Sequence, residues 1–168
     1  MPLSMHQASV PPFVRQLGVL SALLAKGEAF ATEKNLPPAE LLDARLAPDM
    51  HPLTRQVQIA SDAAKGACAR LAEIEVPSFT DTETSFAELQ DRIARTIAFV
   101  EGVAAERFEG SETRTVTLQA GPREFAFTGQ AFLLQFALPN FYFHITTAYA
   151  ILRHTGVPLG KMDFLGGV

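Results

Sequence analysis

The sequence predicts a mainly α-helical fold, a bundle of four long helices with a small β-hairpin inserted before the last of them. Two observations lead to this fold class. Apolar residues recur at three- and four-residue steps over four long segments, and the pattern changes to alternation over one short segment. With 168 residues and no internal repeat or low-complexity tract, the chain has the size of one domain, so we expect residues 1–168 to form a single unit.

The first long helix is expected over residues 9–33. Pro11 and Pro12 are tolerable only in its opening turn, where their missing amide donors would be unpaired anyway. The residues that form its apolar face are Phe13, Leu17, Leu20, Leu24 and Ala31. A short helical piece, AELLDARL, is expected before Pro48.

The second long helix is predicted to begin near Asp49, because this side chain can cap free amides and Pro52 is acceptable in a first turn. It should end near Glu73. The residues with the spacing of a bundle seam are Leu53, Val57, Ala60, Ala64, Ala67 and Leu71. The third helix should follow Ser85, which has capping-box spacing to Glu88. Its apolar stripe consists of Phe86, Leu89, Ile93, Ile97, Val100 and Ala104.

The alternating segment lies within TVTLQAGPREFAFT, which predicts two short strands with Ala-Gly-Pro as their turn. The residues expected on one side of this hairpin are Val116, Leu118, Phe125 and Phe127. The last helix should extend over residues 129–154, with Gly156 as its stop. Pro139 should kink this helix or divide it in two.

Composition argues against two classes of partner. The net charge is -4 and no cluster of Lys and Arg offers a basic surface, so we expect no binding of nucleic acid. Charged residues punctuate almost every apolar stretch, and the start MPLSMHQASV lacks the features of a secretory signal. We therefore expect a cytoplasmic protein without a membrane partner. The single cysteine, Cys68, occupies an apolar helical position and should be a small buried thiol.

The strongest candidate for a functional site is His144, within the apolar run PNFYFHITTAYAILRHTG. At about 100° per residue, Asn140, His144, Thr147 and Ile151 share one side of a helix, so His144 should face the interior. Asn140 lies four residues earlier, at the spacing of two helical metal ligands, although an amide oxygen is a weak ligand that prefers hard ions. Alternatively, His144 and Asn140 bond to each other, or to carbonyls freed by Pro139, as a buried polar pair.

Other histidines could complete a metal site. His51 lies in the first turn of the predicted second long helix and points roughly opposite to its apolar seam, but it could approach His144 if that helix start is covered on two sides. His6 is near the amino terminus, and His154 is at the end of the last helix, where a cation is favoured by the helix dipole. We assign neither a functional role.

Two runs, RLAPDMHPLTRQVQIASDAAK and LPNFYFHITTAYAILRHTGVPLGKMDFLG, resemble a bacterial family classed as a domain of unknown function. That family is placed in the DinB/YfiT-like superfamily of proposed metalloenzymes. The resemblance covers essentially the whole chain. It implies an up-down-down-up four-helix bundle and, because many members dimerise through this bundle, a homodimer.

Typical superfamily members bind a divalent metal through one His on the second helix and a His-x-x-x-His pair on the last, followed by Gly-Gln-Leu and then Leu-Arg. Alignment of the Leu-Arg pair with Leu152 and Arg153 places the second histidine of the pair on His144. The first histidine falls on Asn140 and the Gln falls on Thr147. The resemblance thus implies a site around these three residues, in which one ligand is altered.

The second-helix ligand has only His51 or Gln56 as candidates. A metal set of His144, His51 and Asn140, holding zinc, nickel or manganese, is what the resemblance implies. Such a cation lowers the pKa of a bound thiol or water, but a site of this kind normally needs three strong ligands.

Two functional hypotheses follow. The first is a dimeric, non-catalytic bundle with a degenerate metal site around His144, which binds a small apolar molecule or a partner. The second is a divalent-metal-dependent thiol transferase or hydrolase that acts on a small molecule, with His144 as ligand or base. The incomplete ligand motif favours the first hypothesis.

Overall fold

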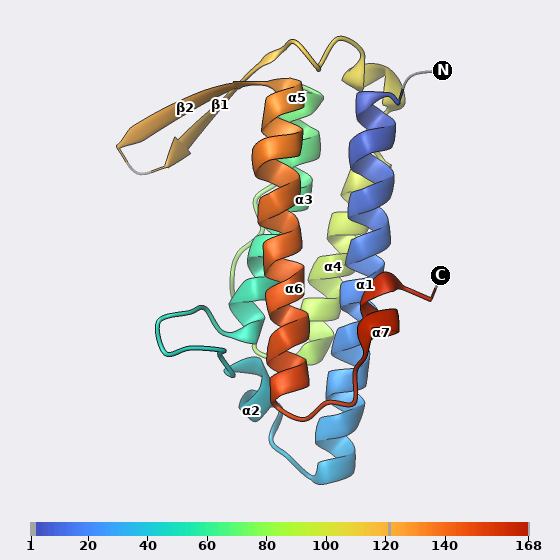
Figure 1. The fold of residues 1–168 in the computed structure, drawn as a ribbon, viewed down its shortest axis with the longest axis vertical. Coiled ribbons are helices and arrows are strands. Elements are labelled where there is room, and N and C mark those ends of the chain that lie inside the picture. The colour runs from blue at the N-terminus through green and yellow to red at the C-terminus, as the bar shows by residue number, and fades with distance from the viewer. Residues whose placement is uncertain (1–2, 121, 168) are drawn as a thin grey trace.

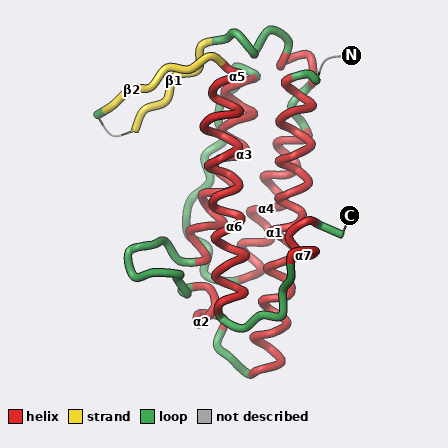
Figure 2. The backbone as a smooth tube through the Cα atoms, viewed as in Figure 1, coloured by secondary structure: helices red, strands yellow, loops and turns green. Residues whose placement is uncertain are grey.

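A computed structural model gives the fold and describes residues 3–120 and 122–167 (Figure 1). The helices are α1 (Met5–Lys34), α2 (Pro38–Leu42), α3 (Leu53–Leu71), α4 (Phe86–Glu101), η1 (Ala105–Phe108), α5 (Gly129–Ala131), η2 (Phe132–Ala137), α6 (Leu138–His154) and α7 (Lys161–Leu165). The strands are β1 (Thr115–Ala120) and β2 (Arg123–Thr128). The fold is therefore mainly helical with one small hairpin before the last long helix, as the sequence predicts (Figure 2).

Helix α1 begins a full turn earlier than predicted, because Ser4 forms a capping box with Gln7. The Ser4 hydroxyl accepts the Gln7 amide at 3.1 Å, and the Gln7 side chain accepts the Ser4 amide at 3.1 Å. Pro11 and Pro12 consequently lie inside the helix and not in its opening turn. The carbonyls that they leave without a donor belong to exposed Gln7 and half-buried Ala8, where water can satisfy them.

The start of α3 also differs from the prediction, because Asp49 is not its cap. Pro52 holds the N-cap position without a side-chain hydrogen bond, and the Leu53 amide donates instead to the carbonyl of Ala44 at 3.0 Å. The loop after α2 therefore supplies the acceptor that a capping side chain would have supplied. The predicted cap of α4 is confirmed, since Ser85 and Glu88 form a capping box.

The hairpin pairs β1 with β2 in antiparallel register, with Val116 opposite Phe127 and Leu118 opposite Phe125. These four apolar residues share one side, as predicted. In Figures 1 and 2 the hairpin projects away from the helical body near the start of α5. Of the predicted Ala-Gly-Pro turn, Gly121 lies outside the described residues.

The last helical segment is continuous from α5 through η2 to α6, and Pro139 does not break it. The π-helical η2 comes directly before Pro139, which occupies the first turn of α6. The wider π turn accommodates the proline ring and its missing amide, so the helix changes type where a kink or a division was predicted. Gly156 follows α6 with a φ of 99°, the left-handed conformation that ends a helix. The short α7, which the sequence did not predict, packs against α1.

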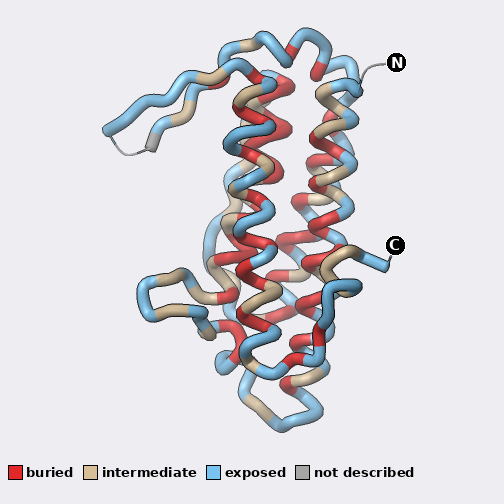
Figure 3. Tube along the Cα trace, viewed as in Figure 1, coloured by how far each residue is buried: buried red, intermediate tan, exposed pale blue. Residues whose placement is uncertain are grey.

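The core lies between the four long helices, whose inward faces are buried along most of their length (Figure 3). Helix α6 packs mainly against α3, and α4 packs against both α1 and α3. Within the described part of the chain, α1 is the one helix long and apolar enough to cross a membrane, and 50% of its apolar window is buried in the helical body. A core helix passes the same test, so this feature is weak evidence for a membrane span.

Candidate functional site

His144 lies on the face of α6 that packs against α3, and its partner there is Gln56. The His144 side chain is buried, with 8% of its surface exposed, and its Nδ1 lies 2.7 Å from Oε1 of Gln56. Gln56, at 1% exposed, occupies the first turn of α3. A hydrogen bond between the two long helices therefore stands where the sequence suggested a bond within α6.

The bonding of Gln56 fixes the proton on His144. The Gln56 amide nitrogen donates to the backbone carbonyl of His51 at 3.0 Å, and a carbonyl can only accept. The oxygen of the amide therefore faces His144 and must receive a proton from Nδ1. Neutral His144 is thus protonated at Nδ1, which leaves a lone pair on Nε2, an atom without a hydrogen bond to any described residue.

Electrostatics keep this imidazole neutral. Burial lowers the pKa of His144, and the positive fields of His51 and Arg55 lower that pKa further. Because the pKa falls below its ordinary value, the neutral form predominates at neutral pH. His144 can therefore offer an unprotonated Nε2 as a ligand or base, provided that a partner group comes within reach.

The other residues predicted for this site, Asn140 and Thr147, form no hydrogen bond with His144 in the described part of the chain. Asn140 is half-buried, and its side chain makes no hydrogen bond with the described residues. It lines a groove beneath the hairpin instead. The buried hydroxyl of Thr147 donates to the carbonyl of Phe143 at 2.7 Å, within its own helix. The suggested pairing of His144 with Asn140 is therefore wrong.

The third predicted ligand, His51, meets this site through its backbone and not through its side chain. His51 is exposed, and its backbone carbonyl is the part that meets Gln56. Across residues 3–120 and 122–167, no three His, Cys, Asp or Glu side chains come together in a way that could hold a metal ion. Cys68 is buried as predicted, and burial raises the pKa of its thiol to about 12, so it is not a thiolate nucleophile at neutral pH.

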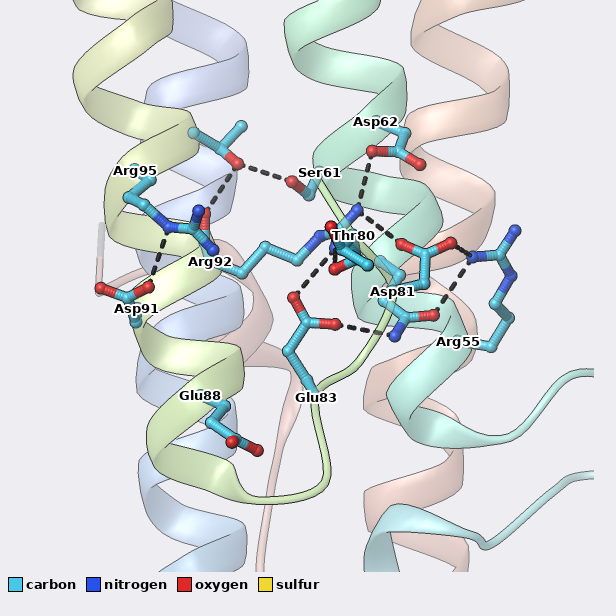
Figure 4. Close-up of polar contacts among 12 residues, drawn as sticks. Arg55, Ser61, Asp62, Thr80, Asp81, Glu83, Glu88, Asp91, Arg92 and Arg95 are labelled. Atoms are coloured by element: carbon cyan, nitrogen blue, oxygen red, sulfur yellow. Dashed lines mark hydrogen bonds and ion pairs between the residues drawn. The ribbon is translucent and has the colours of Figure 1, made fainter. Parts of the chain in front are cut away.

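A second polar cluster, which the sequence analysis missed, surrounds Arg92 of α4 (Figure 4). Arg92 is fully buried, and its guanidinium contacts three carboxylates: Asp62 at 2.9 Å, Asp81 at 3.0 Å and Glu83 at 2.9 Å. Burial alone would raise the pKa of Glu83, but hydrogen bonds from Arg92 and Gln58 outweigh it and hold this pKa below its usual value.

A signal for this cluster was present in the sequence. Arg92 follows Leu89 by three residues and precedes Thr96 by four, which places it on the buried side of α4. A buried arginine requires acidic partners, and the segment SFTDTETS before α4 contains two, Asp81 and Glu83. The cluster fastens that segment to α3 and α4, and its charges are engaged with each other, so we regard it as structural.

Comparisons with known proteins place this geometry in context. The sequence model of a family described as a domain of unknown function (DUF1993) matches residues 5–165. The crystal structure of a DinB family member protein from Shewanella denitrificans is similar to this chain, with a TM-score of 0.91 and 42% sequence identity. The similarity covers 98% of this chain and 93% of that chain. Among curated proteins, none matches.

Proposed function

Because this chain belongs to the DUF1993 family, we propose that it is a non-catalytic, DinB-like protein in which the metal site around His144 is degenerate. In this proposal the helical body is an up-down-down-up four-helix bundle that forms a homodimer in the bacterial cytoplasm. His144 and Gln56 act as a polar link between α6 and α3. The link holds the two helices in one register.

One observation carries the proposal: Nδ1 of His144 is bonded to the uncharged amide of Gln56, and among the described residues no group of three His, Cys, Asp or Glu side chains could hold a metal ion. A catalytic metal normally has three strong protein ligands. Gln56 occupies the position of the ligand that the superfamily has on its second helix. Asn140 occupies the position four residues before His144 and is hydrogen-bonded to neither Gln56 nor His144. The donor set therefore does not fit a three-ligand site.

Exposed apolar side chains support the homodimer. Tyr142 and Phe143, on the outer face of α6, are 37% and 55% exposed, and Leu134 of η2 is 51% exposed. Large exposed apolar side chains are typical of surfaces that bind another chain. In a two-fold symmetric dimer, this face of one copy would pack against the same face of the other copy.

The alternative is a divalent-metal-dependent thiol transferase or hydrolase for a small molecule. It is favoured by one observation, the unprotonated Nε2 of His144. Metal-ligating histidines generally donate a hydrogen bond from the N–H of their other ring nitrogen to an oxygen, as Nδ1 of His144 does to Gln56. Zinc, nickel or manganese would require His51 and Asn140 to move toward His144 as additional ligands. A bound cation would supply an activated thiol or water at neutral pH.

Elemental analysis of purified protein separates the two functions. The wild type, His144→Ala and the control His154→Ala should be produced with zinc, nickel and manganese supplementation. We expect far less than one ion per chain in all three proteins. Near-stoichiometric metal in the wild type and in His154→Ala, with loss in His144→Ala, would overturn the non-catalytic proposal in favour of the metalloenzyme.

A further inference from the structure

A groove of about 410 Å³ lies beneath the hairpin, between β1 and β2 on one side and α3 and α6 on the other. Its apolar wall includes Phe125, Phe127 and Phe136, of which Phe125 and Phe136 are 44% and 42% exposed. The rings of Phe127 and Phe136 lie 6.0 Å apart and form a continuous aromatic surface. This volume is within the range of small-molecule sites.

Arg70 of α3 supplies a cation at this apolar groove. Its Nη1 donates to the carbonyl of Gly66 at 2.9 Å, while Nε and Nη2 have no partner among the described residues. No carboxylate of the described chain forms an ion pair with Arg70, and burial lowers the pKa of its guanidinium. A half-buried arginine without a counter-charge is costly and is stabilised by an anion that completes its hydrogen bonds.

The second charged group of the groove is already neutralised. Asp62 contacts Arg92 at 2.9 Å and Lys65 at 2.9 Å, so its negative charge is shared by two cations. Arg70 is therefore the charge in the groove that remains free for a ligand. The α3 wall extends from Ile59 to Arg70, roughly 16 Å of helix at about 1.5 Å per residue, which suits an elongated molecule.

We propose that this hairpin groove binds a small amphipathic carboxylate, with the acid group on Arg70 and the apolar chain along Phe125, Phe127 and Phe136. The free amide of Asn140 offers a further polar contact on the α6 side. The inference goes beyond the proposed function and does not depend on whether His144 binds a metal.

Isothermal titration calorimetry on the full chain tests this site with octanoate, decanoate and dodecanoate below their micelle concentrations. The affinity should rise about fourfold for each added methylene, because each is buried against the aromatic wall. Decanoate should bind at least about tenfold more tightly than decanol or decylamine of the same chain length, since those head groups lack the charge that pairs with Arg70.

Variants locate the two halves of the site. Arg70→Gln should weaken decanoate at least about tenfold and leave decanol unchanged, whereas Phe125→Ser should weaken both ligands. The control Arg123→Gln alters an exposed arginine on the same hairpin that does not line the groove, and it should change nothing. The head-group comparison needs only the wild type, so it stands even if a variant folds poorly. Absence of heat with decanoate, or equal binding of decanoate and decylamine, would overturn the proposal.

Discussion

Nδ1 of His144 lies 2.7 Å from Oε1 of Gln56, so a single hydrogen bond joins α6 to α3 inside the helical body. Asn140, one turn earlier on α6, takes no part in this bond and lines the hairpin groove. Two residues that the sequence placed in one site thus belong to two different environments.

Truncation of His144 should destabilise the fold, and truncation of Asn140 should not. His144→Ala leaves the Gln56 oxygen buried without a donor, at a cost of about 1–3 kcal/mol in the free energy of unfolding. Asn140→Ala removes no hydrogen bond to the described chain and should cost less than about 0.5 kcal/mol. Urea denaturation followed by circular dichroism measures both values. Equal losses would show that Asn140 shares the polar link.

Stability should depend on pH through His144. Its pKa in the folded state lies below the unfolded value of about 6.5, because of burial and then of His51 and Arg55. As the pH falls, the unfolded chain binds the proton first, so the stability present above about pH 6.5 is lost as the pH approaches the folded-state pKa. His144→Phe cannot titrate, so its stability relative to the wild type should improve as the pH falls.

Chemical denaturation of the wild type and His144→Phe between about pH 7 and pH 5 tests this dependence. Other titrating groups are common to both proteins and cancel in the difference. A difference that stays constant with pH, or a His144 pKa at or above its ordinary value by NMR, would contradict the expected shift.

The sequence predicted the helices and the hairpin because those depend on local patterns. Apolar spacing located the four long helices, and the Ser85 and Glu88 capping box marked the start of α4. The prediction that Asp49 caps α3 was wrong, because the Leu53 amide donates to the carbonyl of Ala44, in the loop after α2. Pro139 does not interrupt the last helical segment, because the preceding π turn accommodates its ring.

The site was less predictable, because it depends on the register in which α3 packs against α6. Periodicity correctly placed His144 in the interior, yet it could not show which α3 residue lies opposite. Gln56 was one of two candidates, and a shift of one turn would have brought a different residue to His144. The sequence analysis assigned no role to Arg92, because its acidic partners lie on α3 and in the loop before α4 and only the fold brings them to it.

Loss of the Arg92 guanidinium should be far more damaging than loss of an exposed arginine on the same helix. Arg92→Met leaves Asp62, Asp81 and Glu83 without their shared cation, at a cost of about 3–5 kcal/mol. Arg95→Met removes an exposed pair with Asp91 and should cost less than about 1 kcal/mol. Denaturation curves measured side by side provide the comparison, and similar losses would show that the Arg92 cluster adds little.

The apolar outer face of α6 should hold two copies of the chain together. Light scattering coupled to size exclusion is expected to give twice the 18.2 kDa chain mass for the wild type. Phe143→Asp should shift the protein to monomer, because a buried carboxylate without a partner is strongly unfavourable in an interface. The control Leu46→Asp, at an apolar residue 39% exposed in the loop before α3, should leave the dimer intact. A monomeric wild type would contradict the dimer.

The measurement that tests the central claim most directly is the coupling free energy between His144 and Gln56, determined in the presence of a chelator. Gln56→Leu and His144→Phe each leave one buried polar group unpaired, whereas the double variant leaves neither. If the pair is a metal-independent link between α3 and α6, the double variant should be more stable, by about 1–3 kcal/mol, than the sum of the two single losses implies. Losses that add to within about 0.5 kcal/mol would show that the two residues are not a structural link.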